Sequence, residues 1–268
     1  MAWGTRWSAA AGALFIAVVV AGCELDDSDD SNGSTATTEP SDWWKCPTRL
    51  GGGWNFGRIP YGCDVEEFGD AEVVRTDFSP YIFDDEVADR SGERNRYVDE
   101  LYGYLKEGAA DYLSSRREAS AEEVEAWRHA VYATAHQETF WTHYRKGSEE
   151  NDRMLTMIRG DHGHGHGLMQ IDDRWHTEAI ENGKGWHLDE NLTYALDIYY
   201  REWQQAPDEW CVGSPTNWKE RARAAYSAYN GGPTQHCRWT DPNDTWAQND
   251  QGYLEKYEQR TWLDYVSN

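Results

Sequence analysis

The chain has 268 residues and a formal net charge of −23, and it contains 15 Trp and 16 Tyr. This length allows one sizeable domain with appendages, and the composition excludes a chain that is disordered throughout. The acidic balance argues against nucleic-acid binding, because contacts to phosphates need clustered Lys and Arg. A chain of this size cannot bury so many rings completely, so we expect many of the Trp and Tyr side chains to remain partly exposed.

Residues 1–22 predict a secretory signal. Arg6 is followed by an apolar run from Ala9 to Ala21, which is shorter than the roughly twenty residues that span a membrane comfortably. The run ends in Val20-Ala21-Gly22-Cys23, which resembles a bacterial lipobox. The resemblance implies cleavage before Cys23 and lipid attachment to it, so that acyl chains hold the protein on a membrane surface. An ordinary signal peptide with an incidental Cys23 is the alternative.

Two segments follow the signal before the helical part of the chain. Residues 23–42 predict an acidic, disordered tether, since they hold many carboxylates and very little apolar surface to offset the entropy cost of ordering. Residues 43–92 are rich in Gly, Pro, Asp and aromatic residues and lack a sustained helical period. We therefore expect an irregular N-terminal segment stapled by a disulfide.

Four cysteines remain besides Cys23. An even number in an exported chain favours two disulfides, for which three pairings are possible. We predict Cys46–Cys63 and Cys211–Cys237, which close the shortest loops. A zinc site is the alternative, and the lack of any CxxC pair argues against it.

Helical periodicity dominates residues 93–268, which we assign to one mainly α domain. Apolar side chains recur at three-four spacing from Tyr97 to Leu113, and a capping-box pattern opens the next helix at Ser120. Further helices are predicted over 189–205, from about 216 to the stop signal Gly231-Gly232-Pro233, and over about 253–265. No run of alternating strands is visible.

One carboxylate falls on the core side of the helix that begins at Ser120. Its apolar stripe is Val124, Trp127, Val131 and Ala135, and continuing the period places Glu138 on the same face. Burial there raises the pKa of a carboxyl group. A carboxylic acid that is protonated near neutral pH is what general-acid cleavage of a glycosidic bond requires. The alternative is a helix that ends earlier and leaves Glu138 solvated.

Three motifs around Glu138 resemble those of the lysozyme-like lytic transglycosylases. They are HQETF at 136–140, GHGLMQID at 165–172 and AAYSAYNGGP at 224–233, in the family's order. The longer block from Gly160 to Asp172 is similar to that of the goose-type lysozymes in the same superfamily. The resemblance covers about half of the chain and implies a lysozyme-like helical catalytic domain. Thr139 departs from it, since the family usually has Ser after the acid.

The resemblance also implies roles for individual residues. Glu138 matches the catalytic acid, and Asp161 and Asp172 match the aspartates that goose-type enzymes place near the reacting sugar. Their structural alternatives are a turn residue at Asp161 and a helix N-cap at Asp172. Residues predicted to bind the saccharide are His164, His166, Gly167, Leu168, Met169, Gln170, Tyr229, Asn230 and, by a softer alignment, Tyr253.

The implied substrate is the glycan strand of peptidoglycan, cut between N-acetylmuramic acid and N-acetylglucosamine. In a lytic transglycosylase Glu138 acts as acid and then as base, and the product is a 1,6-anhydro end. In an inverting goose-type lysozyme, Asp161 or Asp172 activates a water molecule instead. We favour the transglycosylase. A non-catalytic lipoprotein that binds peptidoglycan or a metal is a third hypothesis.

The alternating histidines His162, His164 and His166 have the look of a short metal-binding tract. They sit inside a motif that works without metal in the family, so we expect a turn that faces the substrate and neither a metal ion nor another cofactor. The expected partners are glycan strands and, through the lipid, a membrane. We expect a monomer in the cell envelope, on the periplasmic face of the outer membrane.

Overall fold

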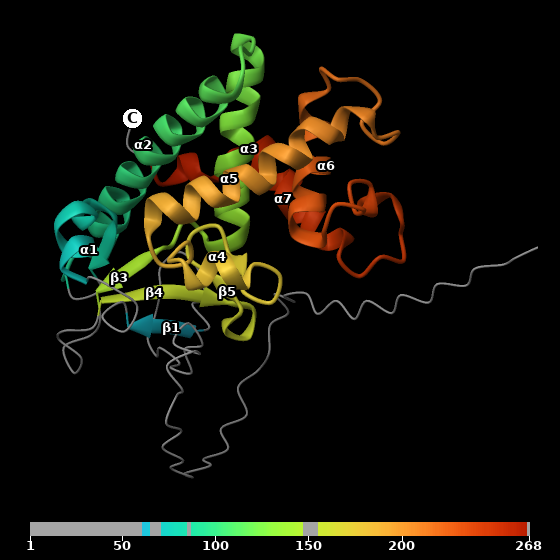
Figure 1. The fold of residues 1–268 in the computed structure, drawn as a ribbon. Helices are drawn as coiled ribbons and strands as arrows, with labels where there is room; N and C mark the ends of the chain where they lie inside the picture. The colour runs from blue at the N-terminus through green and yellow to red at the C-terminus, as the bar shows by residue number, and fades with distance from the viewer. Residues whose placement is uncertain (1–60, 65–70, 85–86, 147–154, 267–268) are drawn as a thin grey trace, which may run out of the picture. The chain divides into compact units, whose positions relative to one another are not determined.

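The computed structural model describes residues 61–64, 71–84, 87–146 and 155–266 (Figure 1). The α-helices in these ranges are α1 (Ala71–Asp77), α2 (Arg90–Arg116), α3 (Ala121–Thr139), α4 (Thr177–Glu181), α5 (Leu188–Gln205), α6 (Trp218–Gly231) and α7 (Ala247–Gln259). The strands are β1 (Tyr61–Asp64), β2 (Ile82–Asp84), β3 (Tyr144–Lys146), β4 (Leu155–Gly160), β5 (Gly165–His166) and β6 (Ile171–Asp172). Short 3-10 helices are η3 (Ser79–Tyr81), η5 (Asp161–Gly163), η6 (Ala206–Asp208), η7 (Arg238–Thr240) and η8 (Thr261–Asp264). The prediction of a mainly α fold is confirmed.

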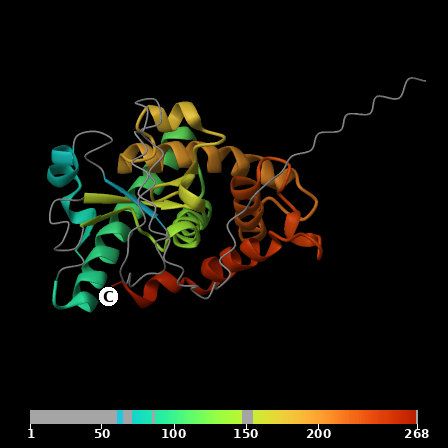
Figure 2. The same cartoon turned by 90° about the horizontal axis from the view of Figure 1, so that it is seen from below.

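Helix α3 lies in the middle of the described part of the chain and packs against α2, α6 and α7. Figures 1 and 2 show α2 on one side of it and α6 and α7 on the other. Its Trp127 is fully buried and donates its indole N–H to the carbonyl of Ala109 at 2.8 Å, which satisfies the one polar group of the ring. The predicted apolar stripe thus becomes the centre of the core.

Both ends of α3 have a local cause. The Ser120 hydroxyl accepts a hydrogen bond from the backbone N–H of Glu123 at 3.1 Å, which caps the first turn as predicted. At the other end Phe140 and Trp141 adopt left-handed φ values of 53° and 60°, which stop the helix directly after Thr139. Burial of the Trp141 ring, whose indole N–H donates to Tyr132 at 2.9 Å, offsets the cost of that conformation.

A small sheet lies against the helices, which the sequence did not indicate. Its strands run in the order β2-β3-β4-β5-β6, and β1 pairs with β4 as well. The β2–β3 pair is parallel and the other pairs are antiparallel. Strands of two to six residues are too short to display a convincing alternation of apolar and polar side chains.

The expectation of an irregular segment over 43–92 is wrong for much of its described part. Strands β1 and β2 of this segment join the same sheet as β3 and β4, and α2 begins inside it at Arg90. The backbone of β1 pairs residues 61–64 with residues 156–159. This segment is therefore continuous with the fold at those strands, and the predicted boundary at residue 93 falls inside a helix.

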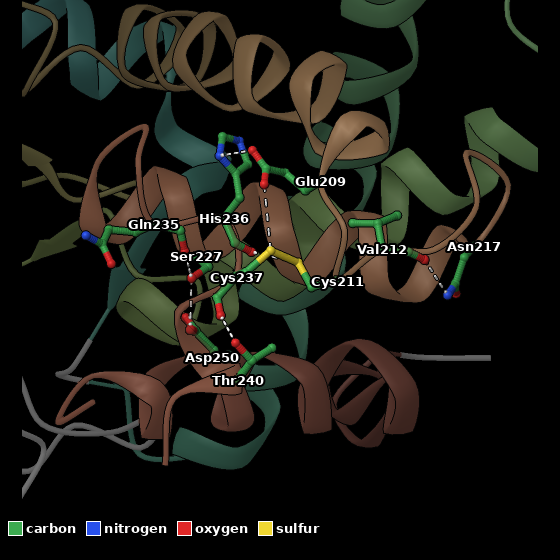
Figure 3. The surroundings of a disulfide bond; sticks show 10 residues. All are labelled: Glu209, Cys211, Val212, Asn217, Ser227, Gln235, His236, Cys237, Thr240 and Asp250. Atoms are coloured by element: carbon green, nitrogen blue, oxygen red, sulfur yellow. Dashed lines mark hydrogen bonds and ion pairs between the residues drawn. A yellow bond between two sulfur atoms is a disulfide. The ribbon is translucent and has the colours of Figure 1, made fainter. Parts of the chain in front are cut away.

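The predicted disulfide between Cys211 and Cys237 is present (Figure 3). It ties the loop after η6 to the loop after α6. Close to it, the Ser227 hydroxyl donates to Asp250 at 2.9 Å, and the Thr240 hydroxyl donates to the carbonyl of Cys237 at 2.7 Å. The predicted bond between Cys46 and Cys63 lies outside the side chains that the structure describes.

The predicted signal peptide, Cys23 and the predicted acidic tether also lie outside the described residues. Within the ranges that the structure covers, no helix is long and apolar enough to cross a membrane. Among the described residues, the exposed large hydrophobic side chains are Phe140, Trp175, Trp210 and Leu263. Many of the other described Trp and Tyr rings are only partly buried where they pack against the core, in agreement with the expectation from their number.

Candidate active site

Glu138 lies in the last turn of α3, on the core side, as the helical period predicts. Its side chain is only partly buried, and its Oε1 accepts a hydrogen bond from the Tyr226 hydroxyl at 2.9 Å. Asn230 forms a second side-chain hydrogen bond to the carboxyl group. Both partners come from α6, whose face is turned toward the end of α3.

Desolvation raises the pKa of Glu138 to about 7. The Tyr226 and Asn230 hydrogen bonds and the positive charges of Arg238 and Lys256 act in the opposite direction, but they do not cancel it. Glu138 is therefore held near the midpoint of its titration at neutral pH. A group in this state can give up a proton and take one back.

Asn230 is itself held in place by Arg238. The Arg238 guanidinium donates to the Asn230 side-chain oxygen at 2.9 Å, so the amide NH2 group of Asn230 remains for the acid. The same guanidinium forms a buried ion pair with Asp250, with N–O distances of 2.6 and 3.0 Å. Arg238 directly follows Cys237 of the disulfide. The loop after α6 is thus fixed to the residues that contact Glu138.

The end of α3 is tied to the Gly-Leu-Met-Gln turn. The Thr139 hydroxyl donates to the carbonyl of Leu168 at 2.9 Å, so the hydroxyl kept at this position has a specific partner. Tyr229 of α6 donates its hydroxyl to the carbonyl of Met169 at 2.6 Å. The residues after Glu138 and the end of α6 therefore meet on the same short turn.

His143 and Asn191 hold this turn from the inside. The Nδ1 of His143 accepts the backbone N–H of Leu168 at 2.8 Å, which leaves the proton on Nε2 to face the carbonyl of Trp186 at 3.0 Å. Burial lowers the pKa of His143 to about 3, which suits this neutral form. The side-chain oxygen of Asn191 accepts the N–H of Met169 at 3.0 Å. These buried polar contacts set the shape of the turn.

Gln170 explains two of the glycines that precede it. Its side chain folds back and donates to the carbonyl of Gly167 at 2.8 Å. A Cβ at Gly160 or Gly165 would come within 1.9 or 2.3 Å of the Gln170 side-chain oxygen, so no larger residue fits at either position without moving the amide. Gly160 and Gly165 therefore make room for the Gln170 side chain.

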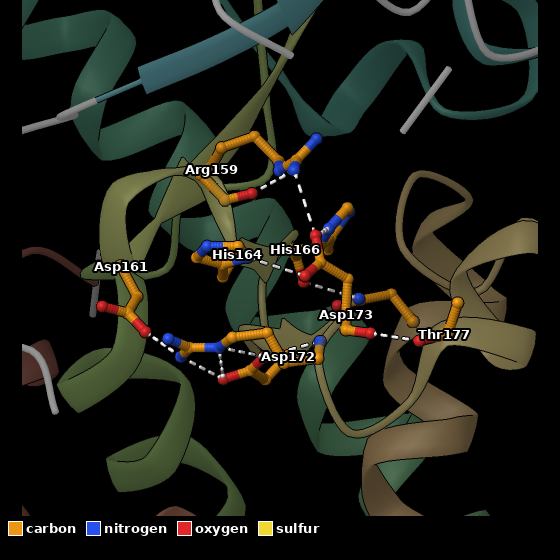
Figure 4. Close-up of polar contacts among 10 residues, drawn as sticks. Arg159, Asp161, His164, His166, Asp172, Asp173 and Thr177 are labelled. Atoms are coloured by element: carbon orange, nitrogen blue, oxygen red, sulfur yellow. Dashed lines mark hydrogen bonds and ion pairs between the residues drawn. The ribbon is translucent and has the colours of Figure 1, made fainter. Parts of the chain in front are cut away.

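Two of the three histidines are held by one aspartate (Figure 4). The Nδ1 of His164 lies 2.8 Å from one oxygen of Asp173, and the Nε2 of His166 lies 2.9 Å from the other. Burial opposes the ionisation of Asp173, yet the hydrogen bonds from His166 and His164 outweigh it and hold the pKa of that carboxyl below its usual range. Burial lowers the pKa of His166 to about 4, so His166 donates as a neutral ring.

This arrangement is a hydrogen-bonded brace, and Asp173 occupies ring nitrogens that a metal ion would need. Among the described side chains, no group of three or more His, Cys, Asp and Glu residues could hold a metal ion. The side chain of His162 is outside that description. His166 is almost fully buried and does not face a substrate, whereas His164 keeps 39% of its side chain exposed.

Asp161 and Asp172 are brought together by Arg174. The guanidinium of Arg174 hydrogen-bonds Asp161, and its Nε lies 2.9 and 3.1 Å from the two oxygens of Asp172. Asp161 opens the 3-10 turn η5 with a left-handed φ of 45°, which agrees with its alternative role as a turn residue. The alternative role of Asp172 as an N-cap is wrong, because α4 begins only at Thr177; Asp172 instead accepts the backbone N–H of Arg174 at 2.9 Å.

The structure divides the predicted saccharide-binding residues into two groups. Asn230 is exposed, and partly exposed positions are His164, Gln170 and Tyr229. The buried ones are His166, Gly167, Leu168, Met169 and Tyr253. For His166, Leu168, Met169 and Tyr253 the prediction of direct contact through the side chain is wrong, since these side chains form the layer beneath the surface.

Tyr253 shows how such a misassignment arises. Its ring is fully buried and stacks on Tyr226 with a centroid distance of 4.2 Å. Its hydroxyl lies 3.0 Å from that of Tyr199. Tyr253 therefore supports the ring that hydrogen-bonds Glu138 and does not meet a ligand.

Several residues around the site were missed in the sequence. Tyr226 lies one helical turn before Asn230, so periodicity could have placed both on the face of α6 that carries the family motif. Asp173 and Arg174 directly follow the predicted Asp172, but only the fold brings them back onto His164 and Asp161. The partners His143, Asn191 and Arg238 carry no local signal, because they act through contacts with distant parts of the chain.

Three comparisons with known proteins bear on these residues. No protein-family model, no curated protein and no solved structure matches this chain.

Proposed function

We propose that the chain is a peptidoglycan lytic transglycosylase, in which Glu138 is the general acid and then the general base. The observation that carries this proposal is the partly buried carboxyl of Glu138, whose pKa is raised to about 7 while Tyr226 and Asn230 hold it in one orientation. The proposal is also supported by the three motifs around Glu138, whose order resembles that of the lysozyme-like enzymes. The bond to be cut is the β-1,4 linkage from N-acetylmuramic acid to N-acetylglucosamine.

In the first step Glu138 gives its proton to the glycosidic oxygen as the bond to the muramic C1 breaks. The sugar ring passes through an oxocarbenium-like transition state. In the second step the C6 hydroxyl oxygen of the same sugar attacks C1, and its proton passes to the Glu138 carboxylate. The cycle restores the acid and leaves a 1,6-anhydro end without using a water molecule or a second carboxylate.

Tyr226 and Asn230 suit both halves of this cycle. Each donates a hydrogen bond to the carboxyl group, and donors of this kind stabilise the ionised form that follows proton transfer. Desolvation favours the protonated form that starts the cycle. The balance between the two effects allows the same carboxyl group to give up a proton and to take one back near neutral pH.

The state of the two aspartates supports the transglycosylase over the hydrolase. An inverting hydrolase needs a carboxylate that is available to take a proton from water. Here Asp161 and Asp172 share the guanidinium of Arg174. Lone pairs that accept hydrogen bonds from a cation are less available to water.

Digestion of purified sacculi tests the proposal, with the released products analysed by mass. Anhydromuropeptides are expected. Muropeptides with reducing ends would instead establish a hydrolase that uses Asp161 or Asp172. Binding to sacculi without release of products would establish the non-catalytic alternative.

A pair of variants on one helix isolates the acid. Glu138→Gln keeps the shape but removes the proton, and we expect product release to fall by at least about a hundredfold, the scale of general acid catalysis. Glu122→Gln makes the same change at an exposed position of the first turn of α3 and should retain full activity. A fully active Glu138→Gln variant would contradict the mechanism.

We also propose that a lipid on Cys23 holds the enzyme at the membrane of the cell envelope. The support is the small residues before Cys23 and the acidic stretch after it. Cells fed with a labelled fatty acid should transfer the label to the wild-type chain. Cys23→Ala should lose the label, whereas labelling that persisted in this variant would place the lipid elsewhere or rule out this anchor.

A further inference from the structure

Arg174 has an unusual set of contacts for an arginine whose side chain is 30% exposed. Its guanidinium pairs with Asp161 and Asp172, and its own backbone N–H donates to Asp172 at 2.9 Å. The two carboxylates are eleven residues apart in the chain, one after β4 and the other at the end of β6. A single side chain thus joins both ends of the stretch that carries the glycines and histidines.

The pair of aspartates is connected to Glu138 through short, continuous contacts. Thr139, the neighbour of Glu138, donates to the carbonyl of Leu168 in the Gly-Leu-Met-Gln turn. Gln170 of the same turn lies over Gly160, the residue directly before Asp161. The turn therefore lies between the acid and the carboxylates that Arg174 holds.

Asp161 is not fully neutralised by this pairing. One of its oxygens accepts from Arg174, while the other is buried and has no hydrogen-bond partner among the described residues. Its left-handed φ of 45° shows that the backbone holds it in a conformation that few side chains adopt. Such a carboxylate is fixed in place, and removing the guanidinium would free the oxygen that Arg174 now holds to accept from a water molecule.

We propose that Arg174 determines the outcome of the reaction, by occupying Asp161 and Asp172 so that neither activates water and the muramic C6 hydroxyl attacks instead. Arg174 is a positioning residue and does not itself contact the reacting atoms. The inference rests on the proposed function, since it concerns the second step of the same cycle. It assigns to this arginine the choice between two nucleophiles that attack the same carbon atom, C1 of the muramic sugar.

The two routes differ in the nucleophile that attacks the muramic C1 and in the carboxylate that takes its proton. In the transglycosylase route the C6 oxygen forms the new bond to C1, and its proton goes to Glu138. In the hydrolytic route the oxygen of water forms that bond, and its proton goes to Asp161 or Asp172. Removing Arg174 makes the second acceptor available without altering Glu138.

The test compares the products of wild-type protein, Arg174→Gln and Arg174→Lys on purified sacculi. A general base contributes on the order of a hundredfold or more, so we expect the ratio of reducing-end to anhydro products to rise at least about tenfold in Arg174→Gln. Arg174→Lys should fall between the two, because an ammonium group cannot hold both carboxylates as a fork does. If Arg174→Gln does not accumulate as folded protein, the ratio for Arg174→Lys decides.

The double variant Arg174→Gln/Asp161→Asn identifies the base. If Asp161 takes the proton from water, this double variant should return the product ratio toward the wild-type value. If Asp172 takes the proton instead, Arg174→Gln/Asp172→Asn should return the ratio. Arg116→Gln breaks a similar ion pair with Asp197, between α2 and α5, and should leave the ratio unchanged.

Failure of this inference differs from failure of the proposed function. Wild-type protein that released no anhydro products would remove the proposed function itself. Wild-type protein that released them, with a ratio that stayed the same in folded Arg174→Gln and Arg174→Lys, would overturn the role of Arg174 alone. A loss of rate without a change in ratio would likewise assign Arg174 a purely structural role.

Discussion

At the scale of single residues, the pKa of Glu138 connects structure to chemistry. Burial at the end of α3 raises it to about 7, while Tyr226 and Asn230 keep the ionised form accessible. The direction of this shift could be predicted from helical periodicity, because the period put a carboxyl on the core face. The hydrogen bonds that limit the shift come from α6 and could not be read from the neighbouring sequence.

The raised pKa predicts how activity depends on pH. Because the proposed mechanism needs a protonated Glu138 when the substrate binds, kcat/KM should fall about tenfold per pH unit once the pH is well above about 7. Asn230→Ala removes a hydrogen bond that lowers this pKa, so the descending limb should move to higher pH. The exposed Asn243→Ala should not move it. A limb that stayed in place in Asn230→Ala would contradict the role given to this amide.

The same shift predicts a cost in stability. A carboxyl whose pKa is higher in the folded state than in the unfolded one adds stability that is complete below the unfolded pKa and is lost as the pH rises through the folded one. The window therefore runs from about 4.5 to about 7. At pH 8 the free energy of unfolding of Glu138→Gln should exceed that of wild type by as much as about 3 kcal/mol. The variant should therefore unfold at a higher denaturant concentration. At pH 4 the two proteins should have the same free energy of unfolding. Equal free energies at pH 4 and at pH 8 would contradict the desolvation of Glu138.

At the scale of elements, the site is the meeting of the end of α3, the end of α6 and the Gly-Leu-Met-Gln turn. The helices could be predicted, since α3, α5 and α6 lie within a few residues of the expected ranges. Helix α7 runs from Ala247 to Gln259, earlier than the expected 253–265, because a left-handed Arg260 ends it. The strands could not be predicted, because each is short and gains its stability from a distant partner.

Thr139 allows the junction between α3 and the turn to be tested. Thr139→Val keeps the shape of the side chain but removes the donor to Leu168, so the carbonyl loses its partner. We expect a loss of about 1–3 kcal/mol in the free energy of unfolding, together with a lower kcat. Thr139→Ser retains the hydroxyl and should stay close to wild type in both. If Thr139→Val and Thr139→Ser had the same free energy of unfolding and the same kcat, the hydroxyl would not stabilise the junction.

At the scale of the whole described chain, the hydrogen-bond partners of Glu138 come from α6, and the nearer of them, Tyr226, is 88 positions away in the sequence. The disulfide between Cys211 and Cys237 restrains the loop that carries Arg238, because Arg238 directly follows Cys237. Arg238 in turn hydrogen-bonds both Asn230 and Asp250. The shortest-loop rule predicted this bond correctly. That Arg238 next to it would reach the acid through Asn230 was not predictable, since it depends on the loop closing back on α6.

Removing this disulfide should affect both stability and the site. Cys211→Ser/Cys237→Ser opens a loop with a sequence separation of 26 residues, for which chain entropy predicts a loss of about 3–4 kcal/mol. Thermal unfolding measures that loss. Activity at a temperature where the variant is folded should also decrease, because Arg238 is less restrained. Full activity there would show that the ion pair with Asp250 holds Arg238 without help.

The buried position of Glu138 also has a consequence for selection experiments. If the acid costs stability whenever it is ionised, a library screened at alkaline pH for heat resistance alone would collect replacements of Glu138. The same library screened for growth that depends on the enzyme would reject them. A position favoured in one screen and forbidden in the other would identify the reacting group without any substrate, inhibitor or assay of products.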